Sequence, residues 1–318
     1  MQGVKLPPAV FEQHLPKFLT TIWQVPDDHD LEIDFSRGRF YIPVAVTSLI
    51  ARIDYATSNG GKVRLCGLNK CDNLRYLQRI DFFKRLGVEL DEDFARRDPE
   101  DAFVPVREVP IGGVSIRNDE MATELARCLT RGKEDELFQL AQYSLGEVIA
   151  NVKQHAERVG FVCAQSFKKH EMSRIGIADC GIGLRESFRR TDSPRFQEGM
   201  NDLQVLELAM SPYGSSKAHL RTGPYGETAN KGVGLTMIRF MAAQSYGHFF
   251  LASGKAWWYR DGLRPEISST FPAEVSVHGT VVGVAFQRSQ VDDYLKLRRL
   301  AWDALGLTEK PADTKLFT

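Results

Sequence analysis

The sequence predicts an α/β protein, of the α+β kind, made of a small N-terminal α/β unit and a larger C-terminal α/β domain. The chain has 318 residues, a length that favours two domains over one. Strand and helix signals alternate over residues 30–95, and they resume after a stretch rich in proline and glycine. We therefore predict five segments: a helical lead-in at 1–25, a small α/β domain at 26–98, a linker at 99–118, a larger domain at 119–290, and a C-terminal helix and tail at 291–318.

The composition is that of a soluble globular protein, with 43% hydrophobic and 26% charged residues. Lys and Arg number 41, and so do Asp and Glu, which argues against direct binding of nucleic acid through a basic surface. No stretch approaches the roughly 20 apolar residues of a membrane helix, so no membrane contact is expected. The five cysteines are scattered and odd in number, which favours reduced thiols in a cytoplasmic protein.

The N-terminal unit is predicted from short alternating signals. Residues Leu31–Phe35 alternate apolar and polar side chains, as a half-buried strand does, and Lys62–Gly67 reads as a second strand. Residues Val44–Ala56 and Asn73–Gly87 carry apolar residues at helical spacing, and glycine follows or ends each run. These elements form a small α/β unit.

The larger domain is predicted to begin with helices and to continue with strands. The expected elements are helices at 119–129 and 134–156, strands near 159–167 and 173–178, a polar loop at 211–231, a helix at 234–246, a hairpin around Ser253-Gly254, a strand at 275–286 and an amphipathic helix at 291–306.

A first candidate motif lies on the helix expected at 134–156. Glu147 and Asn151 are four residues apart and therefore share one face of the helix. A neutral amide oxygen suits a magnesium ion that keeps several waters and binds phosphate oxygens, so Asn151 is a candidate metal ligand. Glu147 could polarise an attacking water or hydroxyl, and His155 lies one turn further on. Taken alone, this pair is better explained by a solvated helix face.

A second candidate motif follows the strand near 173–178. Asp179 ends an apolar run, and Gly181 and Gly183 come next. A carboxylate at a strand end can accept a hydrogen bond from an exocyclic amine such as that of adenine, and glycines let the backbone approach a flat ring. An ordinary strand-to-loop turn is the alternative.

A third candidate motif opens the helix expected at 234–246. Gly232, Val233, Gly234 and Leu235 begin this helix, and amide groups at a helix N-terminus can hold phosphate. Lys231 precedes them and would add a positive charge. A polar loop as long as 211–231 is usually functional or disordered, and its functional version is a lid over the phosphates. A helix whose start happens to be rich in glycine is the alternative for this motif.

Order, spacing and context together resemble the GHKL (histidine-kinase-like, Bergerat) superfamily of ATP-binding domains, most closely the anti-sigma-factor serine kinases. The resemblance covers about 121–290 and rests on four motifs. They are Glu147 to Asn151 as the N-box, Asp179-x-Gly181-x-Gly183 as the adenine box, Asn230 to Leu235 as the glycine box, and Gly279-Thr280 on a late strand. It implies a Bergerat α/β sandwich, in which a mixed sheet carries helices on one face.

The resemblance implies binding of Mg-ATP, with transfer of the γ-phosphate to water or to a protein serine or threonine. Glu147 would then be the catalytic base and Asn151 the ligand of Mg²⁺. The nucleotide-binding residues would be Asn151, His155, Asp179, Gly181, Gly183, Lys231, Gly232, Val233, Gly234, Leu235 and Thr280. One departure matters, because Gln154 stands where the family often has a phosphate-contacting lysine. This departure motivates the alternative of an ATP-gated switch that does not hydrolyse ATP.

Residues 26–98 resemble, in element order alone, a STAS-type domain, the fold of the antagonists that anti-sigma-factor kinases phosphorylate. In that fold the phosphorylated residue lies between a central strand and the next helix. The corresponding loop here, 67–73, has no hydroxyl side chain, so a docking or regulatory role is implied instead. A generic small α/β unit remains an equal alternative. The expected partner is a protein that docks or accepts phosphate, or a second copy of the chain in a homodimer.

Overall fold

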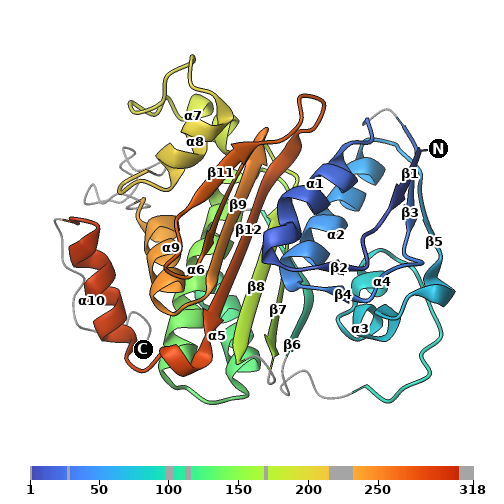
Figure 1. The fold of residues 1–318 in the computed structure, drawn as a ribbon, viewed down its shortest axis with the longest axis horizontal. Coiled ribbons are helices and arrows are strands. Elements are labelled where there is room, and N and C mark those ends of the chain that lie inside the picture. Colours follow the sequence, from blue (N-terminus) through green and yellow to red (C-terminus); the bar gives the residue numbers. More distant parts are fainter. Residues whose placement is uncertain are drawn as a thin grey trace.

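The computed structural model is a mixed α/β protein built around one large sheet (Figure 1). It describes residues 2–26, 29–96, 103–111, 116–167, 171–214 and 232–307. A small module formed by residues 2–96 packs on one face of the large sheet, and we call it the N-terminal module. Longer helices cover the opposite face.

The large sheet has seven strands in the order β11-β10-β9-β12-β8-β7-β6. Their bounds are β6 (Phe103–Val109), β7 (Gly160–Phe167), β8 (Met172–Asp179), β9 (His248–Gly254), β10 (Ala256–Asp261), β11 (Ile267–Thr270) and β12 (Val277–Gln287). Every pairing in this sheet is antiparallel. The expectation of a mixed sheet is therefore wrong.

One face of the sheet is covered by helices α5 (Ile116–Thr130), α6 (Glu136–His155), α9 (Gly234–Gln244) and α10 (Tyr294–Ala304). Helix α6 begins where the Asp135 side chain accepts a hydrogen bond of 3.1 Å from the Phe138 amide, a typical N-cap. Two short helices, α7 (Gly183–Arg190) and α8 (Asp202–Ala209), lie beyond the end of β8. The long and amphipathic helices of this face agree with the sequence prediction.

The N-terminal module contains its own small sheets. Strands β1 (Gln2–Lys5), β3 (Leu31–Asp34) and β5 (Val63–Cys66) pair in parallel, and β2 (Ala9–Val10) pairs with β4 (Phe40–Tyr41). Its helices are α1 (Leu15–Trp23), α2 (Pro43–Ser58), α3 (Leu74–Arg79) and α4 (Phe82–Arg85). Short 3₁₀ turns lie at Glu12–His14, Leu68–Lys70 and Arg288–Gln290.

Three of these details differ from the sequence prediction. The expected helical lead-in at 1–25 contains strand β1, which pairs with β3, and only its second half is helical. The helix expected at Asn73–Gly87 is divided into α3 and α4, because Asp81 adopts a left-handed backbone with φ of 60°. The expected linker at 99–118 contains β6, an edge strand of the large sheet that pairs with β7.

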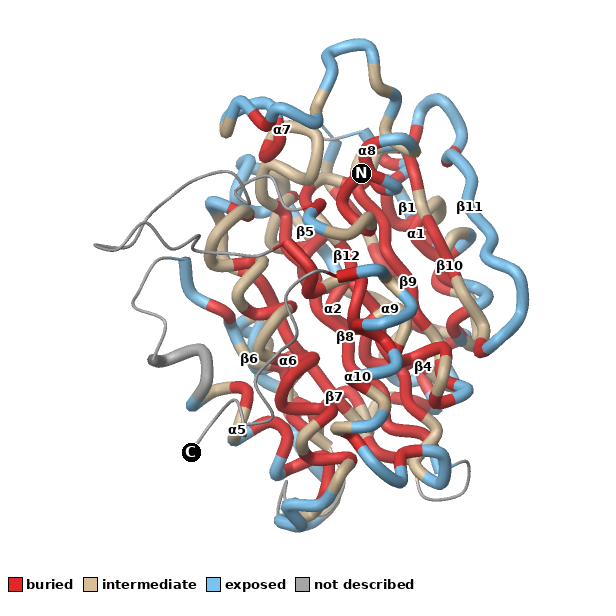
Figure 2. The backbone as a smooth tube through the Cα atoms, turned by 90° about the vertical axis from the view of Figure 1, so that its left-hand side faces the viewer, coloured by how far each residue is buried: buried red, intermediate tan, exposed pale blue. Residues whose placement is uncertain are grey.

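Helix α2 of the N-terminal module packs across the second face of the large sheet, whereas the long helices of the larger domain lie on the first face. The contact is close because Gly176 of β8 and Gly283 of β12 lie opposite each other beneath Val44. A Cβ atom at position 176 would lie 2.2 Å from the Val44 amide nitrogen. The central strands are consequently buried from both sides, as the red core in Figure 2 shows.

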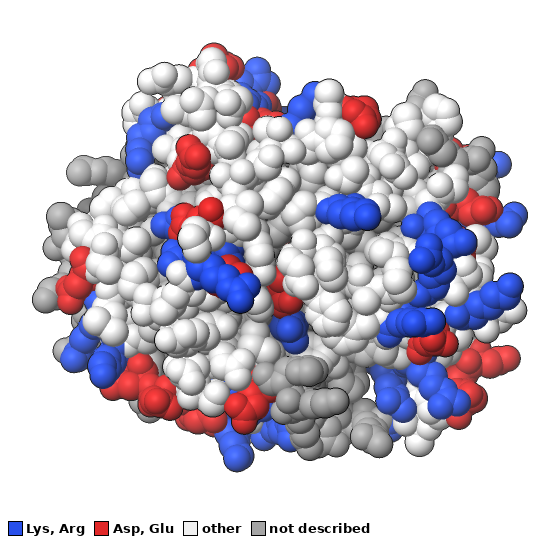
Figure 3. Space-filling view, viewed as in Figure 1, with Lys and Arg blue, Asp and Glu red and all other residues white. Residues whose placement is uncertain are grey.

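Charged side chains of both signs are interleaved on the face of the molecule drawn in Figure 3. The ion pairs of the described residues include Arg75 with Asp93 and Arg96 with Asp81. Within the ranges that the structure describes, no helix combines the length and apolar character needed to traverse a bilayer.

Candidate functional site

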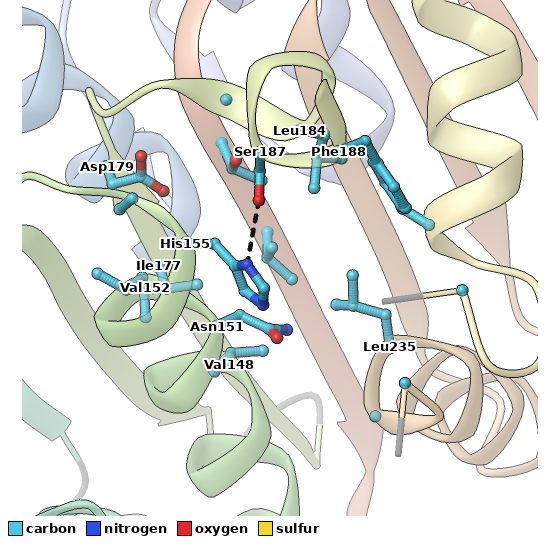
Figure 4. A pocket seen from close by; sticks show the side chains of 18 residues that line it. Val148, Asn151, Val152, His155, Ile177, Asp179, Leu184, Ser187, Phe188 and Leu235 are labelled. Atoms are coloured by element: carbon cyan, nitrogen blue, oxygen red, sulfur yellow. Dashed lines mark hydrogen bonds between the residues drawn. The ribbon is translucent and has the colours of Figure 1, made fainter. Parts of the chain in front are cut away.

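An open pocket lies between α6, α7 and the first turn of α9, over the ends of β8 and β12 (Figure 4). Its empty space, including open solvent at the mouth, is about 730 Å³. The lining residues are Val148, Asn151, Val152, His155, Ala156, Ile177, Asp179, Gly183, Leu184, Ser187, Phe188, Ala209, Gly214, Gly232, Gly234, Leu235, Thr280 and Val282. Eight of the residues singled out in the sequence are among them.

Helix α6 supplies one wall of the pocket. Val148, Asn151, Val152 and His155 recur at spacings of three and four residues, which places them along one side of the helix. Asn151 and His155 point into the space between α7 and α9 in Figure 4. The Nδ1 atom of His155 lies 3.0 Å from the Ser187 hydroxyl oxygen, a hydrogen bond that joins α6 to α7.

Asp179 is the most deeply buried charged group of the site, with only 4% of its surface exposed. Its Oδ1 atom accepts a 2.8 Å hydrogen bond from the Gly181 amide, and the Thr280 amide also donates to the carboxyl group. Burial raises the pKa of Asp179 to about 7, and the two amide donors oppose that rise. The group is therefore poised between its acidic and ionised forms at neutral pH.

Glycine is required at several positions around Asp179 because neighbouring segments of the chain approach them closely. Gly279 has φ of +77°, and a Cβ atom there would lie 2.2 Å from the Asp179 carbonyl oxygen. Gly183 has φ of +71° and lines the pocket. Gly181 does not line it: a side chain at 181 would collide with the Ala156 carbonyl at the end of α6. The sequence prediction thus holds for Gly183 as a pocket residue, whereas Gly181 packs on a helix.

The glycine box is only partly within the described residues. Gly232, Gly234 and Leu235 line the pocket, and α9 begins at Gly234. Val233 is buried and is not among the lining residues. Lys231 and most of the polar loop, 215–231, lie outside the described residues, so their predicted roles stay predictions.

Glu147 lies behind the pocket wall rather than in it. A Cβ atom at Gly234 would be 2.0 Å from the Glu147 Oε2 atom, so the carboxyl group packs directly against the start of α9. Crowding by protein atoms removes water from this group and raises the pKa of Glu147 to about 7. The sequence reasoning placed Glu147 beside Asn151 on an exposed face; in the structure both residues are partly exposed, and Asn151 lines the pocket whereas Glu147 does not.

Several lining residues were missed by the sequence reasoning. Leu184, Ser187 and Phe188 come from α7, a helix that was not predicted, and Ile177 and Val282 come from the sheet. Leu184 and Phe188 are four residues apart directly after Gly183, and that apolar spacing was the signal for a helix at this point.

Among the residues that the structure describes, no three His, Cys, Asp or Glu side chains cluster in a way that could hold a metal ion by themselves. A magnesium ion here would need ligands from a bound phosphate chain in addition to Asn151, as is usual for this ion.

Compared with protein-family models, with curated proteins and with solved structures, the chain matches none of them. The GHKL resemblance therefore rests on the four motifs and on the residues that line the pocket.

Proposed function

We propose that the protein binds Mg-ATP in this pocket, in the manner of the GHKL superfamily. The observation that carries the proposal is the meeting of four segments that are far apart in the sequence. Asn151, Asp179, Gly234 and Thr280 come from α6, β8, α9 and β12 and line one pocket.

The chemistry of the inner end of the pocket fits a purine. Ile177, Val282 and Leu184 provide apolar walls, and Gly183 lines the same space. Asp179 provides a buried acceptor for an exocyclic amine, and a strongly shifted pKa is common among functional residues.

The chemistry of the opposite end fits phosphate. Gly232 and Gly234 place backbone amides at the N-terminus of an 11-residue helix, where the helix dipole favours anions. Asn151 and His155 face the same space and add a metal ligand and a polar contact. Bound magnesium would neutralise phosphate charge there.

For the reaction, we propose that Glu147 acts as general base, with water or a protein hydroxyl as phosphoryl acceptor. A pKa of about 7 suits that task, because a base works best when its pKa lies near the operating pH. The protein would then be an ATPase or a protein serine/threonine kinase.

A second candidate function is an ATP-gated switch without turnover. It is favoured by the position of Glu147, whose carboxyl group packs against Gly234 and does not line the pocket. Nucleotide binding would then control a protein partner or a homodimer contact.

The two functions are separated by ADP formation from labelled ATP, measured for the wild-type protein and for Glu147→Gln. Enzyme function predicts more than one ADP per protein molecule in the wild type. Glu147→Gln should slow ADP formation on the order of 100-fold while ATP still binds, because general bases contribute roughly 10²–10⁴-fold.

Binding without ADP in the wild-type protein would instead establish the switch. Equal rates in the wild type and in Glu147→Gln would refute the role of Glu147 as base. Adding cell extract then identifies the acceptor, since label on a protein indicates a kinase and free phosphate alone indicates an ATPase.

A further inference from the structure

The N-terminal module reaches the purine-reading end of the pocket from behind the sheet. Asp179 is followed directly by Cys180, and Thr280 is preceded by Gly279 and His278. Cys180 and His278 both contact α2 of the N-terminal module. Asp179 and Thr280, the residues proposed to face the purine, thus each lie within two positions of a residue that contacts the N-terminal module.

The first connection is a buried hydrogen bond. The Cys180 thiol donates to the Ala51 carbonyl of α2 over 2.8 Å. Cys180 is only 3% exposed, so this contact is shielded from water. It fixes the chain at the end of β8, next to Asp179.

The second connection is a stack of rings. The Tyr55 ring of α2 lies parallel to the His278 ring, with centroids 4.3 Å apart and planes inclined by 15°. Trp23 of α1 packs against both, at 5.6 Å from Tyr55 and 5.3 Å from His278.

The module side of this stack is held rigidly. Buried Arg52 donates to the carbonyls of Ile22 and Val25 over 3.1 Å each, and its guanidinium lies 4.9 Å from the centre of the Trp23 ring. The end of α1 is thereby fixed to α2, and a displacement of α2 would carry the aromatic stack with it.

The pocket side is equally tight. The Thr280 amide donates to the Asp179 carboxyl group, and Gly279 has no space for even a Cβ atom beside the Asp179 carbonyl. Gly279 packs directly against Asp179, so a displacement of His278 would act on Asp179 and Thr280 through this close backbone contact.

From these contacts we propose that Tyr55 and His278 are positioning residues for base recognition, so that the docking of the N-terminal module and the affinity for the purine are coupled. This inference rests on the proposed nucleotide function. Coupling between two sites is reciprocal, so a partner that shifts the module changes the affinity for the base, and a bound base favours the docked module.

The test compares ATP with magnesium tripolyphosphate, which has the phosphates of ATP but no base, by calorimetric titration. Tyr55→Ala should weaken ATP binding about tenfold, because an aromatic pair contributes on this scale, and should leave tripolyphosphate binding unchanged. Tyr55→Phe keeps the stack and should bind ATP like the wild type. If Tyr55→Ala does not fold, Tyr55→Leu keeps most of the apolar volume and serves in its place.

The matched control is Phe40→Ala. Phe40 also packs a ring of the module on a ring of the large sheet, at 5.7 Å from Phe167. Phe167 lies at the opposite end of β7 from Gly160, the partner of Asp179, so this contact is remote from the purine end. Phe40→Ala should lower stability and leave the ratio of the two affinities unchanged.

An unchanged ratio of ATP to tripolyphosphate affinity in Tyr55→Ala would overturn the coupling, as would an equal change of that ratio in Phe40→Ala. Failure of the wild-type protein to bind ATP is a different result, and it would overturn the proposed function itself.

Discussion

Asp179 carries a carboxyl group that is 4% exposed, at the end of a strand whose eight residues are all buried. Two backbone amides satisfy part of its hydrogen-bonding capacity, yet burial still raises its pKa to about 7. The ionised form of this group is therefore disfavoured in the folded protein.

The free energy of unfolding should depend on pH because the buried carboxyl group of Asp179 disfavours its ionised form. The pKa of Asp179 is raised from 3.8 to about 7, so the folded state holds a proton that the unfolded chain releases above pH 4. Its contribution to stability is therefore fully present below about pH 4 and is lost as the pH rises toward 7. Asp179→Asn does not titrate, and relative to the wild type its free energy of unfolding should increase between pH 5 and pH 8 by at most about 3 kcal/mol, since each pH unit between pH 5 and pH 7 contributes about 1.4 kcal/mol.

The measurement is urea unfolding of both proteins, without nucleotide, at pH 5 and pH 8. Differences between the two proteins matter here, since other titrating groups affect both equally. A difference that does not change with pH would contradict the burial of an ionisable carboxyl group at this position.

Which site residues the sequence could reveal depends on the kind of signal. Asn151, His155, Asp179 and Thr280 belong to motifs with fixed spacing, and the structure places all four on one pocket. Ser187 and Val282 belong to no motif, because many different residues in many sequence contexts can form an apolar wall or supply a supporting hydroxyl group. The contact between the Glu147 carboxyl group and the start of α9 could not be predicted either, since it depends on where α9 begins in space.

At the scale of elements, the docking of α2 onto the large sheet depends on two glycines. Gly176 and Gly283 face each other on β8 and β12, and Val44 at the start of α2 rests on both. At Gly176 a Cβ atom would meet the Val44 backbone at 2.2 Å, whereas at Gly283 it would meet only the Val44 side chain at 3.1 Å. Backbone cannot move aside as a side chain can.

Gly176→Ala should therefore destabilise the protein by about 2–4 kcal/mol, the range for overpacking that forces backbone to shift. Gly283→Ala should cost less, about 1 kcal/mol or below, because the Val44 side chain can adjust. Gly3→Ala is the control in a strand, since nothing lies within 4 Å of its Cβ position. Thermal and urea unfolding measure the loss of stability in each variant. Equal losses for Gly176→Ala and Gly283→Ala would contradict the close docking of α2.

The elements that the sequence predicted well are those with long periodic patterns. Helix α6 and the strands β7, β8 and β12 lie close to their predicted bounds. The elements missed were short or at edges: β1, β6 and β11 are edge strands of their sheets. Such strands show weak alternation, and β6 contains Pro105, which an edge tolerates and which suggested a linker.

At the scale of the whole molecule, one sheet separates two hydrophobic cores. One core lies between the sheet and helices α5, α6, α9 and α10, and the other lies between the sheet and the N-terminal module. The second core includes Phe161, Phe250 and Val281 from the sheet together with Leu49 and Ile53 from α2. Because the module shares this core with the sheet, we expect the two to unfold together.

Sequence patterns report which residues are buried but do not report which unit covers them, and the docked module was not predicted for this reason.

The central claim is that the pocket formed by α6, β8, α9 and β12 binds Mg-ATP through Asp179. The most direct measurement is a calorimetric titration of the wild-type protein and of Asp179→Asn with Mg-ATP at pH 7.5. We predict one ATP per chain in the wild type and an affinity at least about tenfold lower in Asp179→Asn, because a site built to pair with a donor loses on the order of 1–3 kcal/mol when that pairing fails. No binding in the wild type, or equal binding in both proteins, would contradict the claim.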